Sequence, residues 1–214
     1  MEGKAVSQYK TQGVNLSDIV KRAFDLMMSF FGLIILSPFF IIISLLIKLD
    51  SLGPVLFKQV RVGRYEKSFK ILKFRTMVTD AEKRGAQITV GRDSRITRVG
   101  HFLRKSKLDE LPQLINVFKG DMSFVGPRPE VPKYTQYYTK NQKRIFEIRP
   151  GITDYASIKY RDENEILALS SNPEKTYIDE IMVDKLKLNL EYLEKKSLFT
   201  DVKIILNTLY RIVK

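Results

Sequence analysis

The chain has 214 residues, which is enough for one domain with a hydrophobic core. It contains no cysteine and one histidine, so disulfides, thiolate metal sites and multi-histidine metal sites are excluded. The net charge of +13 predicts a polyanionic partner, such as phosphates, nucleic acid or an anionic membrane surface. Residues 58–107 carry a net charge of +11 and residues 162–194 one of −6, so one face or cleft should be electropositive.

Residues 1–17 form a polar and basic N-terminal segment that precedes a long apolar run. Leu26 to Ile47 is 22 residues without a charged side chain. A helix rises about 1.5 Å per residue, so this run is long enough to cross a bilayer core of about 30 Å. A helix that is apolar on every side is not typical of a soluble core.

Two features of this run predict that both of its ends lie on the same side of the membrane. Ser37-Pro38 falls in its middle, and a proline inside a helix removes one hydrogen bond and clashes with the preceding turn. Basic residues flank both ends, and basic flanks mark the cytoplasmic side. We therefore expect residues 18–50 to be a re-entrant membrane helix broken at Ser37-Pro38. A kinked transmembrane helix is the alternative.

The globular part, residues 51–214, begins with a predicted β-hairpin. Residues 55–62 and 68–76 have strand character and are joined by a turn around Gly63. Lys73 and Arg75 lie two residues apart, on one side of the second strand. They are candidates for binding phosphate, and the alternative is a solvated basic face.

Asp109 and Glu110 are two adjacent carboxylates in a basic region. Pro112 predicts that residues 111–118 start a helix there, because proline is tolerated in the first turn. The two acids would then lie at the helix N-terminus, and Leu111, Leu114, Ile115 and Phe118 would form one apolar stripe. They are either capping residues or a carboxylate nucleophile and metal ligand.

Arg128 stands between two prolines, which stiffen the backbone and suit a bidentate phosphate contact. Arg161 is a further cationic candidate after a second stiff turn at residues 149–153. Residues 198–213 form an amphipathic helix with Leu198, Val202, Ile205, Leu209 and Ile212 on one stripe. Such a helix either lies in the membrane interface or covers the core.

With these residues laid out, the chain resembles the bacterial sugar transferase family, the monotopic phosphoglycosyl transferases. The resemblance covers nearly the whole chain, and its motifs occur in the family's order. After the Ser-Pro helix they are GPVLFKQ (53–59), KFRTM (73–77), LDELPQL (108–114), KGDMSFVGPRP (119–129) and RPGIT (149–153). The sequence departs from the family at residues 154–162, where relatives commonly have two glycines and a glutamine that are replaced here.

The resemblance implies an α/β, mostly helical fold: a re-entrant helix plus a small globular domain with a short hairpin and amphipathic interfacial helices. It places this domain on the cytoplasmic face of the bacterial inner membrane. It implies transfer of a sugar 1-phosphate from a UDP-sugar to undecaprenyl phosphate, with release of UMP, in surface polysaccharide or glycoprotein glycan synthesis. It makes Asp109 the nucleophile that forms a phosphosugar intermediate.

The resemblance also implies dependence on Mg²⁺, which Asp109, with or without Glu110, would bind. Lys73, Arg75, Arg128 and Arg161 are the candidates for neutralising the phosphates. The expected partners are the UDP-sugar, undecaprenyl phosphate and anionic lipids, and a homodimer is left open. A catalytically silent, basic membrane-surface binding protein is the alternative. Nucleic acid is not expected, because the chain has no recognisable binding motif.

Overall fold

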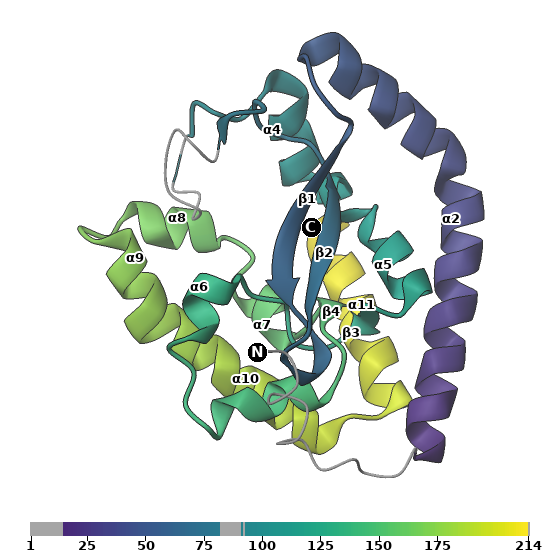
Figure 1. Cartoon of the computed structure of the whole chain (residues 1–214), viewed down its shortest axis with the longest axis vertical. Coiled ribbons are helices and arrows are strands. Elements are labelled where there is room, and N and C mark those ends of the chain that lie inside the picture. Colours follow the sequence, from purple (N-terminus) through teal and green to yellow (C-terminus); the bar gives the residue numbers. More distant parts are fainter. Residues whose placement is uncertain (1–14, 82–90, 92, 214) are drawn as a thin grey trace.

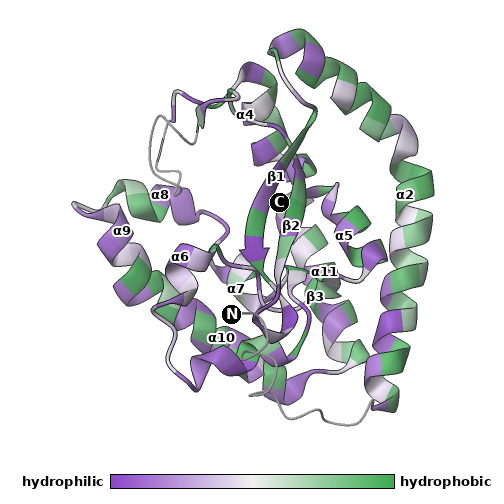
Figure 2. Ribbon diagram, in the orientation of Figure 1, coloured by the Kyte–Doolittle hydropathy of each residue, from purple (hydrophilic) through white to green (hydrophobic). Residues whose placement is uncertain are grey.

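The computed structural model describes residues 15–81, 91 and 93–213. One long helix, α2 (Leu16–Asp50), forms one side of the molecule and curves over the other elements (Figure 1). It is long and apolar enough to cross a membrane, and 11% of its most apolar stretch is buried. Figure 2 shows hydrophobic residues along nearly its whole length. Of the polar segment 1–17, all but the last three residues lie outside the described part.

The predicted break of the helix at Ser37-Pro38 is wrong, because α2 continues as one helix through both residues. Pro38 has no N–H to give to the carbonyl of Ile34. The Ser37 hydroxyl donates to that same carbonyl over 2.8 Å, so the acceptor that proline leaves open is satisfied locally. The helix therefore bends without ending (Figure 1). The re-entrant topology stays a prediction.

The predicted hairpin is present. Strands β1 (Leu56–Val62) and β2 (Ser68–Phe74) pair antiparallel, and the turn between them is a 3-10 helix, Arg64–Glu66. Lys73 lies opposite Phe57 in the register, and Arg61 lies opposite Phe69. Directly paired residues share one face of a sheet, and residues 57 and 61 of β1 are an even number of positions apart. Lys73 and Arg61 therefore lie on the same face of the hairpin.

The remaining elements are short, and most of them are helical, as expected for a mostly helical α/β chain. Strands β3 (Ser123–Val125) and β4 (Gly151–Thr153) form a second, parallel pair. The remaining described helices, in chain order, are α4 (Arg98–Lys105), α5 (Gln113–Lys119), α6 (Pro132–Thr135), α7 (Tyr155–Lys159), α8 (Glu163–Ala168), α9 (Pro173–Thr176), α10 (Met182–Lys195) and α11 (Leu198–Val213). There are also 3-10 helices at Leu108–Glu110 and Gln142–Glu147 and a π-helical turn at Tyr177–Ile181.

Helix α5 starts two residues later than expected, and its apolar stripe has a different role. Phe118 is exposed and its ring stacks on Phe30 of α2, while Leu114 lies under Gly32 of α2. The buried residues of α5 are Leu114, from the stripe, together with Gln113, Asn116 and Val117. The stripe therefore faces the long apolar helix, and a polar-containing face is buried against the hairpin.

Helix α11 also buries a different face from the predicted stripe. Its buried residues are Asp201 and Ile204, which pack toward Tyr192 and β3. Of the predicted stripe, Leu198, Val202 and Leu209 are exposed and Ile205 is half-buried, while the side chain of Ile212 lies outside the described part. Further apolar side chains lie exposed beside the stripe. The exposed apolar residues of α11 are Leu198, Phe199, Val202, Leu206, Leu209 and Tyr210. This exposure favours the interfacial role, because α11 is already attached to the core by its other face.

Candidate functional site

Glu110 is the centre of a compact ion cluster. Lys73 Nζ donates to Glu110 Oε1 over 2.8 Å, and Arg128 Nη1 donates to Oε2 over 3.1 Å. Arg128 Nη2 makes a second bond to Oε1, so the guanidinium grips the carboxylate with both of its terminal nitrogens. Three residues that are far apart in the chain, and that sequence analysis had each singled out, therefore meet at one point.

The backbone before α5 brings the two acids to this point. Asp109 and Glu110 lie in the 3-10 helix that precedes Pro112, after Lys107 in a left-handed conformation with φ 57°. Left-handed backbone is uncommon for residues other than glycine, so it marks a sharp redirection of the chain here. Asp109 and Glu110 were expected in the first turn of the helix, and they lie instead in the 3-10 turn directly before it.

Asn116 connects α5 to the strand that carries Lys73. Its Nδ2 donates to the Lys70 carbonyl over 2.8 Å, and its Oδ1 accepts from the Leu72 amide over 2.9 Å. The side chain is buried, and both the oxygen and the nitrogen of its amide bond to β2. Asn116 thereby holds β2 beside α5 and sets the distance between Lys73 and Glu110.

The loop that carries Arg128 is held from behind by Asp154. The Arg128 amide donates to Asp154 Oδ2 over 3.1 Å, and the same carboxylate caps α7 by accepting from Ser157 N over 2.6 Å. Beneath the loop the backbones of Gly126 and Gly151 nearly touch: a Cβ on Gly151 would lie 2.1 Å from Gly126 N. Asp154, at the start of the divergent stretch, therefore supports the site.

Asp109 differs sharply from its neighbour. Its side chain is 8% exposed, yet within the described residues its carboxylate accepts no hydrogen bond and makes no ion pair. Burial raises the pKa of Asp109, while the positive charge of Lys73 lowers it in part. An uncommitted, partly desolvated carboxylate is a stronger nucleophile than a paired one.

The charges around Glu110 make it the permanent anion of the pair. Burial favours its neutral form, but Arg128 and Lys73 together outweigh burial and hold the pKa of Glu110 well below its usual range. Burial lowers the pKa of Lys73, and Glu110 opposes that change. The pKa of Arg128 is raised by the charge of Glu110.

Sequence analysis missed two cations near the site. Arg61 donates to the carbonyl of Pro129 over 3.1 Å and to Glu130 over 3.3 Å, so it fastens the Arg128 loop to β1. Arg104, on α4, acts electrostatically on Asp109 and donates to Thr76 Oγ1 over 2.9 Å. The period-two alternation of the hairpin could have indicated Arg61, which lies on the same face as Lys73.

The structure does not bring Arg75 or Arg161 to this cluster. Arg75 donates to the carbonyls of Ser51 and Leu52 and to the Ser51 hydroxyl, at the end of α2. Arg161 donates to the carbonyl of Arg211, near the end of α11. Both cations thus satisfy carbonyl groups at helix C-termini, which favour positive charge. Their role toward a substrate stays a prediction.

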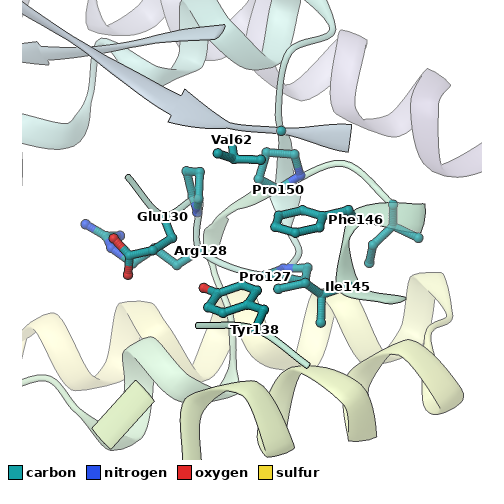
Figure 3. A pocket seen from close by; sticks show the side chains of 11 residues that line it. Val62, Pro127, Arg128, Glu130, Tyr138, Ile145, Phe146 and Pro150 are labelled. Carbon is teal, nitrogen blue, oxygen red and sulfur yellow. The ribbon is translucent and has the colours of Figure 1, made fainter. Parts of the chain in front are cut away.

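A small pocket behind the Arg128 loop is not the substrate site. Its walls include Val62, Pro127, Tyr138, Ile145, Phe146 and Pro150. In Figure 3 the charged ends of Arg128 and Glu130 lie to one side, away from Ile145 and Phe146. A space of about one water molecule cannot hold a ligand the size of a nucleotide.

Asp109 and Glu110 are the residues that could hold a divalent cation. No group of three or more His, Asp or Glu side chains converges within the described ranges. Mg²⁺ is commonly held by one or two carboxylates together with substrate phosphates, so an all-protein cage is not required. The oxygens of Asp109 suit such a site, whereas those of Glu110 are engaged by Lys73 and Arg128.

Comparison with known proteins shows which family the chain belongs to. The chain is 36% identical over 211 residues to a UDP-glucose:undecaprenyl-phosphate glucose-1-phosphate transferase of Escherichia coli K12, covering 96% of this chain and 43% of that protein. It is 35% identical over 199 residues to a UDP-N-acetylgalactosamine-undecaprenyl-phosphate N-acetylgalactosaminephosphotransferase of Aeromonas hydrophila, covering 91% and 44%. The chain spans less than half the length of these two relatives.

A third relative has nearly the length of this chain. The uncharacterized sugar transferase EpsL of Bacillus subtilis 168 is 38% identical over 195 residues, which cover 91% of this chain and 88% of that protein. The family model described as bacterial sugar transferase matches residues 16–214, from the first residue of α2 to the last residue of the chain. The chain therefore belongs to the bacterial sugar transferase family.

Proposed function

We propose that this protein transfers a sugar 1-phosphate from a UDP-sugar to undecaprenyl phosphate and releases UMP. The observation that carries the proposal is the unequal carboxylate pair: Asp109 is uncommitted, and Glu110 is tied to Lys73 and Arg128. Two relatives bear the names of undecaprenyl-phosphate transferases for glucose 1-phosphate and N-acetylgalactosamine phosphate. Their different sugars mean that the family does not assign the donor of this chain.

Asp109 is the nucleophile in this proposal. One of its carboxylate oxygens attacks the sugar-bearing phosphorus, and the bond from that phosphorus to the bridging oxygen breaks, so UMP leaves with the bonding electrons. An oxygen of the acceptor phosphate then attacks the same phosphorus and expels the Asp109 carboxylate. Arg128 and Lys73 stabilise charge on the non-bridging oxygens. Bound Mg²⁺ would supply further positive charge at the diphosphate, with Asp109 and Glu110 as its candidate protein ligands.

The acceptor explains the apolar surface of the chain. A lipid phosphate lies at headgroup level, so the nucleophile must be held at that depth. We propose that α2 enters and leaves the cytoplasmic face of the inner membrane, and that α11 lies in the interface. Ion pairs from Lys21 to Asp201 and from Lys196 to Asp18, the latter at 3.2 Å, join the start of α11 to the start of α2. These contacts couple the interfacial helix to the membrane helix.

We expect single cysteines at the two ends of α2 to be labelled from the same side of the membrane. The chain has no cysteine, so Ser17→Cys and Leu52→Cys each give one thiol, and both positions are exposed. Gly53 is unsuitable, because its φ of 125° and the adjacent Arg75 leave no room for a side chain. An impermeant maleimide should label neither variant in intact cells and both after permeabilisation. Labelling of one end alone in intact cells would show that α2 spans the membrane.

The function is tested by measuring UMP release with undecaprenyl phosphate, Mg²⁺ and a panel of UDP-sugars. We expect one donor or a narrow set to release UMP, with the sugar diphosphate lipid formed in equal amount. Without acceptor, UMP release should stop at about one equivalent per enzyme, because the phosphosugar stays on Asp109. Continued, multiple-turnover UMP release without acceptor would indicate hydrolysis in place of transfer. Lipid binding that falls with salt, without UMP from any donor, would support the silent membrane-binding protein.

A further inference from the structure

The carboxylate of Glu110 is already occupied when no substrate is bound. Lys73 and Arg128 both donate to Oε1, and Arg128 also donates to Oε2, which gives three charge-assisted bonds on one carboxylate. A carboxylate offers about four lone-pair sites, so little acceptor capacity remains. The cations that a diphosphate would need and the oxygens that a metal ion would need are therefore engaged with each other.

The three members of this cluster are not equally placed to exchange partners. The Arg128 side chain is 37% exposed, against 20% for Lys73 and 15% for Glu110. The backbone of Arg128 is fixed between two prolines and by its bond to Asp154, so only the side chain can turn. Besides Glu110, that side chain reaches only the Ile152 carbonyl, through a long 3.4 Å bond from Nη1, among the described residues. Lys73 is anchored on β2 through the Asn116 junction. Arg128 is thus the partner that can leave Glu110 while Lys73 stays.

We propose that Glu110 and Arg128 form an exchange latch, in which the diphosphate of the donor takes Arg128 from Glu110. The freed oxygens of Glu110 then join Asp109 as ligands of the divalent cation. This inference rests on the proposed function, because it assumes a nucleoside diphosphate at this site. It goes further by predicting that the metal and the diphosphate bind cooperatively, with Glu110 as a metal ligand in the donor complex only.

The physical reason is competition for one carboxylate. A divalent cation placed on Glu110 in the free enzyme would stand beside the guanidinium of Arg128 and be repelled by it. Once phosphate oxygens hold that guanidinium, the repulsion is replaced by attraction between the metal and the same phosphates. Each ligand then raises the affinity for the other by an equal factor, as linkage requires.

The test is Mn²⁺ binding, measured by electron paramagnetic resonance on the full chain in nanodiscs without nucleotide. We expect wild type to bind weakly and Arg128→Met to bind about ten-fold more tightly, because Glu110 loses its bidentate partner. Arg98→Met is the matched control: it removes the same charge from an exposed position on α4, and Arg98 makes no hydrogen bond or ion pair with Glu110 or with the described Arg128 loop. Its affinity should change about two-fold at most.

A second set of titrations adds UDP as the probe for the diphosphate. In wild type, UDP should tighten Mn²⁺ binding beyond its own solution affinity for the ion, and this coupling should vanish in Arg128→Met. Arg128→Lys keeps the positive charge but cannot hold the carboxylate with two nitrogens, so its Mn²⁺ affinity should lie between those of wild type and Arg128→Met. This variant also provides a second reading if Arg128→Met does not fold. Equal Mn²⁺ affinity in wild type and both Arg128 variants would overturn the latch.

The latch and the proposed function can fail separately. Normal UMP release together with unchanged Mn²⁺ binding in Arg128→Met would leave the function standing and remove the latch. A rise in Mn²⁺ affinity in Arg98→Met equal to that in Arg128→Met would also remove the latch, because the effect would then be one of general charge. The nucleotide-free titration measures Mn²⁺ affinity and needs no turnover, so it tests the latch even when no donor in the panel reacts.

Discussion

Replacing Asp109 by asparagine should lower sugar 1-phosphate transfer by at least about 10³-fold, because the amide cannot attack phosphorus. The change is nearly isosteric, and no described residue bonds to the Asp109 carboxylate. The Glu110 cluster should therefore persist, and the variant should unfold at a similar denaturant concentration. UMP release with the reactive donor measures the loss, and mass spectrometry of the wild type after donor without acceptor should show a phosphosugar on Asp109.

The control for this variant is Asp179→Asn, which removes an exposed aspartate far from the cluster in sequence. It carries the same change of charge and should keep wild-type transfer. Full transfer in Asp109→Asn would exclude Asp109 as the nucleophile. An adduct found on another residue would keep the two-step reaction but assign a different nucleophile.

Replacing Glu110 by glutamine should destabilise the fold by about 2 kcal/mol and also abolish most transfer. Lys73 and Arg128 would then face each other without their shared anion, and leaving buried charge uncompensated is costly. The amide could still accept one hydrogen bond, and water screens the 37%-exposed Arg128, so the expected loss lies below that of a fully buried pair. Urea unfolding of the detergent-solubilised protein measures the loss of stability.

The pH dependence of this difference has a definite sign. The pKa of Glu110 is lower in the folded chain than the unfolded value of about 4.3. Its contribution to stability is therefore fully present above that unfolded value and is lost as the pH falls through the folded pKa. The gap between wild type and Glu110→Gln should be constant near neutral pH and shrink only in strong acid. A gap that grows on acidification would contradict the assignment.

Glu174→Gln is the matched control for Glu110→Gln. Glu174 also pairs with a lysine, Lys133, but both side chains are about half exposed, so water screens the pair. This substitution should change the free energy of unfolding by less than about 0.5 kcal/mol. Equal losses in the two variants would show that the Glu110 cluster is no more than an ordinary surface ion pair.

Much of the candidate site could be predicted from the sequence, because the local chemistry of each residue was visible. Asp109 and Glu110 are adjacent, Lys73 lies in a short strand, and Arg128 stands between two prolines. These patterns, together with the family motifs, indicated phosphate chemistry. The unequal roles of the two acids were not visible, because they depend on which cation reaches which oxygen across 18 and 37 residues of chain.

The cations that the chain uses to satisfy carbonyl groups show why the prediction was incomplete. Arg75 and Arg161 meet helix ends 24 and 50 residues away, and Arg22 reaches the Val117 carbonyl of α5 over 2.7 Å. An arginine that holds a helix end looks the same in sequence as one that awaits a phosphate. The net charge of +13 therefore overstates the charge free to meet an anionic partner.

The sequence by itself determined the long apolar helix, the hairpin and the residues of the candidate site, because these depend on hydrophobic runs, strand alternation and proline stereochemistry. Tertiary structure alone decided that α2 continues through Pro38, that the apolar stripe of α5 faces α2, and that Asp109 is left uncommitted beside a fully engaged Glu110. These outcomes depend on partners distant in the chain, since burial and hydrogen bonding are properties of neighbours in space.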